Sequence, residues 1–180
     1  MDKGVVILLS SGIKATTFTE EDWGKLQDWV KQGGILVAPA LIDVPLGAAT
    51  VFGVNSSSYN KLRISFQWND NHLADKELEY MDQPEERTIA LGNSSGKEGE
   101  TSVKTYGYSV STAETLASFN TGETAVSRNA VGSGYAYSFG FLWRDVIQRS
   151  QLNKDFSASR AYSNAFEPSA DIYPLFIRSL

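Results

Sequence analysis

The chain has 180 residues, a length that favours one domain with a sizeable buried core. Its formal net charge is -5 and it carries no dense run of Lys and Arg, so we expect no nucleic-acid partner. It contains no cysteine, which excludes disulfides, thiolate metal sites and a thiol nucleophile, and which favours an exported protein over a cytosolic one. No apolar stretch approaches the roughly 20 residues that span a bilayer, and we expect neither a membrane span nor a signal peptide.

The first forty residues predict a strand, a helix and a second strand. Residues 5–9 form a continuous apolar run, which is typical of a strand buried on both faces. Thr19 is placed to cap a helix whose first turn is acidic and whose apolar residues recur at spacings of three and four. Gly33 and Gly34 end this helix, and residues 35–38 form the next buried strand. This order predicts a parallel βαβ unit.

Most of the later elements are predicted to be extended. Residues 46–52 favour a short helix closed by Gly53, whereas the polar residues 55–60 favour a loop. Apolar and β-branched patterns predict strands at 62–68, 88–91, 103–110 and 115–119. A Gly-rich turn at 131–134 predicts a β-hairpin between residues 124–128 and 135–141.

Two segments carry a family resemblance. The first, residues 5–40, has an apolar strand, a Ser/Gly loop, Thr-Glu-Glu-Asp-Trp, Leu-Gln-Asp-Trp-Val-Lys-Gln-Gly-Gly and the strand Ile-Leu-Val-Ala. The second, residues 124–140, contains Val-Gly-Ser-Gly-Tyr-Ala-Tyr-Ser-Phe-Gly. Together they resemble the class I glutamine amidotransferase-like superfamily, in its non-amidotransferase branch. The resemblance implies an α/β fold, namely a flavodoxin-like three-layer sandwich with a mostly parallel sheet and a β-hairpin near the C-terminus.

The same resemblance implies that the domain is not catalytic. The turn that presents the family's cysteine matches Pro39-Ala40-Leu41, where no side chain can act as a nucleophile. The family's catalytic histidine lies late in the chain, whereas the only histidine here is His72. The family's first βα unit has no counterpart, so we expect residues 1–180 to form a single amidotransferase-like domain that is a fragment of a longer bacterial protein.

Two acidic groups in the middle of the chain are alternative sites for chemistry. A hydrolase could use Asp70, His72 and Glu85 around a metal or a water, but a triad is defined by geometry that the sequence does not give. Neither acidic group has the spacing of a known metal-binding loop. The first group consists of Asp70, His72 and Asp75, and the second consists of Asp82, Glu85 and Glu86. We therefore assign no catalytic, cofactor-binding or metal-binding residue. A hydrolase remains an alternative.

Aromatic and arginine side chains provide the main candidate for a ligand surface. Exposed rings can stack on sugars or dock a neighbouring domain, although rings in strands also serve as core. The sequence therefore predicts a non-catalytic domain that recognises a glycan or packs on an enzymatic module of the same polypeptide. A structural or homo-oligomerisation domain remains a further alternative. The candidate surface residues are Trp68, Tyr106, Tyr108, Trp143, Arg144 and Arg160.

Overall fold

The computed structural model describes residues 4–8, 12–14, 16–60, 62–69, 88–91 and 103–146. Its two longer helices are α1 (Glu20–Lys31) and α2 (Leu46–Phe52). The strands are β1 (Val5–Ile7), β2 (Ile35–Pro39), β3 (Val54–Tyr59), β4 (Ser65–Trp68), β5 (Thr88–Ala90), β6 (Tyr106–Val110), β7 (Glu114–Phe119), β8 (Thr124–Val131) and β9 (Gly134–Phe139). Within these ranges, no helix has the length and apolar character needed to cross a membrane.

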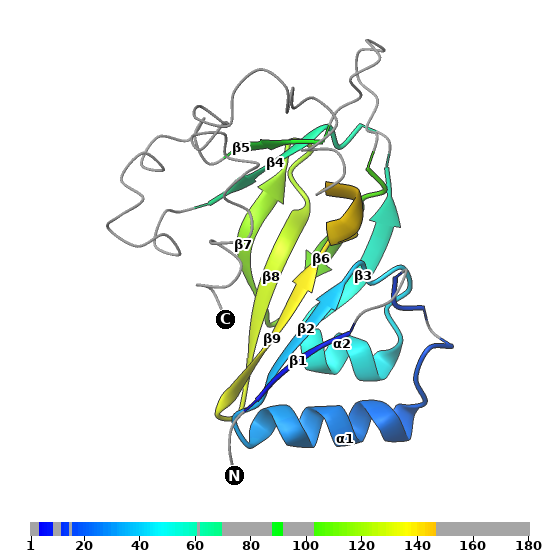
Figure 1. The fold of residues 1–180 in the computed structure, drawn as a ribbon, viewed down its shortest axis with the longest axis vertical. Helices are drawn as coiled ribbons and strands as arrows, with labels where there is room; N and C mark the ends of the chain where they lie inside the picture. Colours follow the sequence, from blue (N-terminus) through cyan, green and yellow to red (C-terminus); the bar gives the residue numbers. More distant parts are fainter. Residues whose placement is uncertain are drawn as a thin grey trace, which may run out of the picture.

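The described strands form one mixed sheet. Its main path runs β1-β2-β9-β8-β7-β4-β5, while β6 pairs with β8 and β3 pairs with β6. Only the pairs β1–β2 and β2–β9 are parallel. The other pairs are antiparallel, and the sheet curls into a half-barrel with α1 and α2 beside the end that carries β1, β2 and β9 (Figure 1).

Helix α1 begins where the sequence predicts it to begin. The Thr19 hydroxyl accepts a hydrogen bond from the backbone N–H of Asp22 at 3.2 Å, and the Asp22 carboxylate accepts one from the Thr19 N–H at 3.0 Å. This reciprocal capping box satisfies donors that a helix start leaves free. It also holds the pKa of Asp22 below its usual value, mainly through the hydrogen bonds from Thr19.

Helix α2 also matches its predicted limits, from Leu46 to Phe52. Gly53 follows with a φ of 64°, in the left-handed region that glycine adopts without strain. The side-chain amide of Asn129, on β8, donates to the carbonyl oxygen of Val51 at 2.8 Å. This bond satisfies one of the free carbonyls at the helix end and ties α2 to the sheet.

The core consists of two clusters on opposite faces of the sheet. We call the first the helix-side cluster; it joins α1 and α2 to the sheet through Trp23, Val30, Phe52, Leu36 and Ala136 among others. We call the second the strand-side cluster; it lies on the other face and includes Val37, Phe66, Trp68, Phe119, Tyr137, Phe139 and Phe141. Side chains of β2 and β9 alternate between the two clusters, as successive residues of a strand must.

The prediction of a flavodoxin-like three-layer sandwich with a mostly parallel sheet is wrong. The expected parallel βαβ unit is present as β1, α1 and β2, and the expected hairpin is present as β8 and β9. Between them, however, the described chain adds antiparallel strands rather than further βα units. The strand-side face is therefore covered by aromatic side chains of curled strands within the described residues, not by a second helical layer.

One predicted loop is a strand. Residues 54–59 form β3, which pairs with β6 from Val54↔Val110 to Tyr59↔Tyr106. Three consecutive serines have low strand propensity and gave the segment its loop-like pattern. Backbone pairing to β6 overrides that preference, as tertiary context commonly does for strands.

Candidate functional site

The structure separates Trp68 and Tyr108 from the other predicted ligand-surface residues that it describes. Trp68 is buried in the strand-side cluster, and Tyr108 is buried in the helix-side cluster on the opposite face. Trp143 is half-buried, with its ring 5.2 Å from that of Phe139. Tyr106 is half-buried and Arg144 is exposed, and both lie near the end of β9.

Several other candidates lie outside the described residues. One of them is Arg160. The others are the first acidic group (Asp70, His72 and Asp75) and the second acidic group (Asp82, Glu85 and Glu86). In the part of the chain that is described, no three His, Asp or Glu side chains are grouped so that they could hold a metal ion.

A different site forms where the parallel strands β2 and β9 end. After β2, Ala40 turns the chain with a φ of 44°, and the following loop is held to β3 because the Ser57 hydroxyl donates to the Ile42 carbonyl at 2.6 Å. After β9, the N–H of Tyr106 donates to the Gly140 carbonyl at 2.6 Å. A Cβ atom at Gly140 would lie 2.4 Å from the Tyr106 carbonyl oxygen, so this approach requires glycine.

Two tyrosines pair at this edge, and two aspartates lie near enough for their charges to act on Tyr106; we call Tyr59, Tyr106, Asp43 and Asp145 the tyrosine site. Tyr59 and Tyr106 are paired across β3 and β6, with ring centroids 6.2 Å apart and Tyr59 53% exposed. Burial raises the pKa of Tyr106, and the neighbouring Tyr59, Asp43 and Asp145 raise it further. Tyr106 therefore keeps its proton at neutral pH and can donate a hydrogen bond.

The acidic side of the tyrosine site carries one paired cation. The Nε of Arg144 lies 3.1 Å from a carboxylate oxygen of Asp145, and the Arg144 side chain is largely exposed. The site thus combines an aromatic surface, carboxylate acceptors and guanidinium donors. Aromatic faces with flanking polar groups suit a polyhydroxylated ligand that has both an apolar face and hydroxyls.

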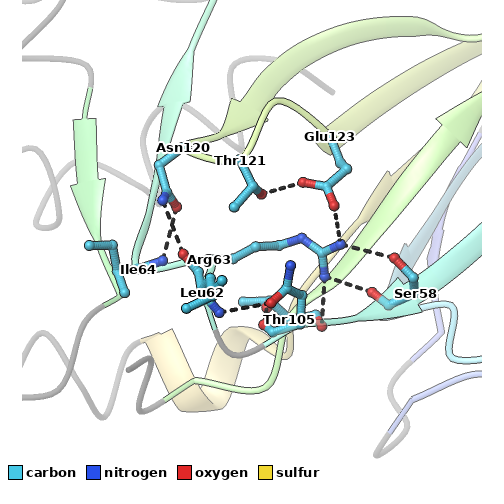
Figure 2. Close-up of polar contacts among 9 residues, drawn as sticks. Ser58, Leu62, Arg63, Ile64, Thr105, Asn120, Thr121 and Glu123 are labelled. Atoms are coloured by element: carbon cyan, nitrogen blue, oxygen red, sulfur yellow. Dashed lines mark hydrogen bonds and ion pairs between the residues drawn. The ribbon is translucent and has the colours of Figure 1, made fainter. Parts of the chain in front are cut away.

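A buried arginine holds the two strands that carry the tyrosines (Figure 2). Arg63 is fully buried, and its guanidinium donates to the carbonyl oxygen of Ser58 at 2.6 Å and to that of Thr105 at 3.4 Å. Ser58 precedes Tyr59, and Thr105 precedes Tyr106. One side chain therefore fixes the backbone beside both tyrosines, and we call this arrangement the Arg63 clamp.

The charge of the Arg63 clamp is balanced by Glu123. A guanidinium nitrogen lies 2.6 Å from the Glu123 carboxylate, and the guanidinium carbon lies 5.3 Å from the centre of the Phe119 ring. Thr121 donates a second hydrogen bond to Glu123. The hydrogen bond from Arg63 is the main cause that holds the pKa of Glu123 below its usual value. A buried guanidinium needs such a partner, because an unpaired buried charge is strongly destabilising.

Comparison with known proteins gives a fold but no family. No protein-family model matches the chain, and no curated protein matches it. Among solved structures, the fold is similar to part of the exo-β-1,4-mannosidase Op5Man5 from Opitutaceae bacterium strain TAV5, with a TM-score of 0.51 and 18% identity over 83% of this chain. A β-galactosidase from Bacillus circulans sp. alkalophilus also matches, at a TM-score of 0.49 and 15% identity over 84% of this chain.

The matched regions are small parts of those enzymes. The chain corresponds to 22% of the mannosidase chain and to 22% of the β-galactosidase chain. The mannosidase shares the fold with this chain, and the described sheet is mixed rather than mostly parallel. The expectation of an amidotransferase-like fold, drawn from residues 5–40 and 124–140, is therefore wrong.

Proposed function

We propose that this chain is a non-catalytic glycan-recognising domain of a larger glycan-processing protein, and that the tyrosine site contacts the glycan. The observation that carries the proposal is the pairing of the exposed Tyr59 with the half-buried Tyr106, close to Asp43 and Asp145. A tyrosine face stacks on the apolar face of a sugar ring, while carboxylates accept hydrogen bonds from its hydroxyls.

The fold likeness supports this assignment to carbohydrate chemistry. The mannosidase that shares the fold acts on β-1,4-linked mannosides, and only a fifth of its chain corresponds to the present one. A domain of this size within a glycosidase can contribute to substrate recognition without supplying the reacting groups.

Calorimetric titration with β-1,4-linked manno-oligosaccharides and galacto-oligosaccharides tests the proposal. We expect Tyr59→Ala to weaken binding roughly fivefold, because loss of one aromatic contact costs about 1 kcal/mol. The matched control is Tyr135→Ala, which removes a tyrosine that is 41% exposed on β9, away from the tyrosine site. Absence of binding to every oligosaccharide, or equal losses in the two variants, would contradict the proposal.

A further inference from the structure

A second surface of the molecule is apolar but uncovered by any described element. On β1, Val5 is 49% exposed and Ile7 is 38% exposed. Val5 pairs with Ile35 of β2, and Ile35 pairs in turn with Tyr135 of β9. These four residues form one apolar corner of the sheet, and we call it the β1 corner.

The β1 corner lies on the strand-side face of the sheet. Ile7 pairs with Val37, and Val37 pairs with Tyr137. Both Val37 and Tyr137 belong to the strand-side cluster, and Ile35 packs against it. The corner therefore continues the core surface outward to the edge strand, where no described residue completes it.

The composition of β1 argues that this surface is covered in the folded protein. Edge strands that face water normally carry a charge, a proline or a bulge, which discourage contact with other chains. The strand Val5–Ile7 has none of these and exposes three β-branched apolar side chains. Such a strand is typical of a position with neighbours on its faces.

The chain itself leaves the described structure on the same face. Val146, the last described residue, is buried in the strand-side cluster. Thirty-four residues follow it, and six of the last nine are apolar or aromatic: Ile172, Tyr173, Leu175, Phe176, Ile177 and Leu180. The β1 corner lies about one strand length from the end of β9, roughly 20 Å, whereas residues 147–171 can span up to about 80 Å.

We infer that the C-terminal segment, residues 172–180, docks on the β1 corner and covers Val5, Ile7, Ile35 and Tyr135. The segment supplies the apolar side chains that the corner lacks, and it starts from the face on which the corner lies. The inference is independent of glycan binding, because the corner and the tyrosine site share no residue.

The absence of native cysteine makes thiol labelling a direct test on the full chain. We expect the single thiol of Val5→Cys to react with a maleimide at least tenfold more slowly than that of Leu46→Cys. Leu46 is 78% exposed at the start of α2 and provides the matched control. Adding Leu175→Asp and Phe176→Asp to Val5→Cys should restore fast labelling while circular dichroism stays unchanged.

Two further outcomes would overturn the inference. Equal labelling of Val5→Cys and Leu46→Cys would show that nothing covers the corner. Protection that survives the two aspartates, or that disappears on dilution, would assign the corner to another segment or to a second copy of the chain. Should the aspartate variant fail to fold, the rate of intramolecular disulfide formation decides: docking predicts that Ile7→Cys with Phe176→Cys oxidises at least tenfold faster than Leu46→Cys with Phe176→Cys, whereas equal rates would overturn the inference.

Discussion

Ala40 holds a backbone conformation that is unfavourable for any residue other than glycine. It is fully buried, and its φ of 44° is the only positive value at a described residue other than glycine. In this region the Cβ atom of an L-residue crowds the following carbonyl, which costs about 1–2 kcal/mol. The turn between β2 and the loop that carries Asp43 is therefore strained, and the surrounding structure holds it in place.

Replacing Ala40 by glycine should relieve this strain. Ala38→Gly is the matched control, because Ala38 is equally buried in β2 and has no positive φ. Both variants lose a buried methyl group and gain chain entropy in the unfolded state, but only Ala40→Gly gains from the relief. We expect the free energy of unfolding of Ala40→Gly to exceed that of Ala38→Gly by about 1–2 kcal/mol in urea titrations. Equal values would show that Ala40 is not strained.

Protonation of Glu123 should lower the stability of the fold in acid. Its pKa is lowered in the folded protein, mainly by the hydrogen bond from Arg63. The resulting stabilisation is fully present above the ordinary carboxyl pKa, about 4.3, and is lost as the pH falls through the lower folded value. Between pH 7 and pH 3, the free energy of unfolding measured in urea should therefore fall less in Glu123→Gln than in the parent chain.

Arg63→Met is the companion variant for this pH experiment, because it removes the donor that lowers the pKa of Glu123. Its free energy of unfolding should fall as little between pH 7 and pH 3 as that of Glu123→Gln, although its stability at pH 7 should be lower than that of the parent chain. If the free energy of unfolding of either variant falls as much as that of the parent chain, the Arg63 clamp does not cause the acid sensitivity of the fold.

The tyrosine site was predictable only in part. The sequence indicates Tyr106 and Arg144, because they are an aromatic and a cation in the strand-rich later half. The sequence does not indicate Tyr59, because it follows three serines and no local pattern marks it as exposed in a strand. The pairing Tyr59↔Tyr106 joins residues 47 positions apart, and nothing in a single sequence specifies that register.

At the level of elements, the two helices show that a glycine can either weaken a helix or permit its close packing. Gly24 lies in α1, and a Cβ atom there would meet nothing within 4 Å. Gly47 lies in α2, and a Cβ atom there would come within 2.4 Å of the Cβ of Trp23. Glycine at position 24 thus only weakens its helix, whereas glycine at position 47 permits the close packing of α2 on α1.

The two Gly→Ala substitutions should therefore change stability in opposite directions. Gly24→Ala should raise the free energy of unfolding by about 0.5–1 kcal/mol, the usual gain in a helix interior. Gly47→Ala should lower it by about 1–3 kcal/mol, the usual cost of overpacking. Thermal and urea unfolding of the two variants, each against the parent chain, provide the measurement. A gain in both would show that α2 does not pack closely on Trp23.

The helices were predictable because their signals are local. The capping box at Thr19 and Asp22 and the glycine after α2 act within a few residues of the ends they set. Strand β3 was not predictable, because its serines favour no element and only the distant strand β6 makes it extended. Local chemistry fixes where an element begins and ends, while neighbours decide whether a weak segment becomes a strand.

At the level of the whole molecule, the order of the strands in the sheet could not be predicted from the sequence. The apolar run of β1 and the glycines after α1 correctly indicated a parallel βαβ unit. Extending that unit to a mostly parallel sheet was wrong, because the alternating patterns from β4 to β9 fit antiparallel strands equally well. Sequence periodicity identifies strands but does not state which strand lies beside which.

The parallel pairing of β2 with β9 also governs when this protein can fold. Ile35 pairs with Tyr135, one hundred residues later in the chain. At synthesis rates of about 5–20 residues per second, a ribosome exposes β2 roughly 5–20 seconds before its partner exists. During that interval the nascent chain presents the apolar edge Ile35–Pro39 to the cell, so chaperone capture is expected to matter most for the first half of the chain.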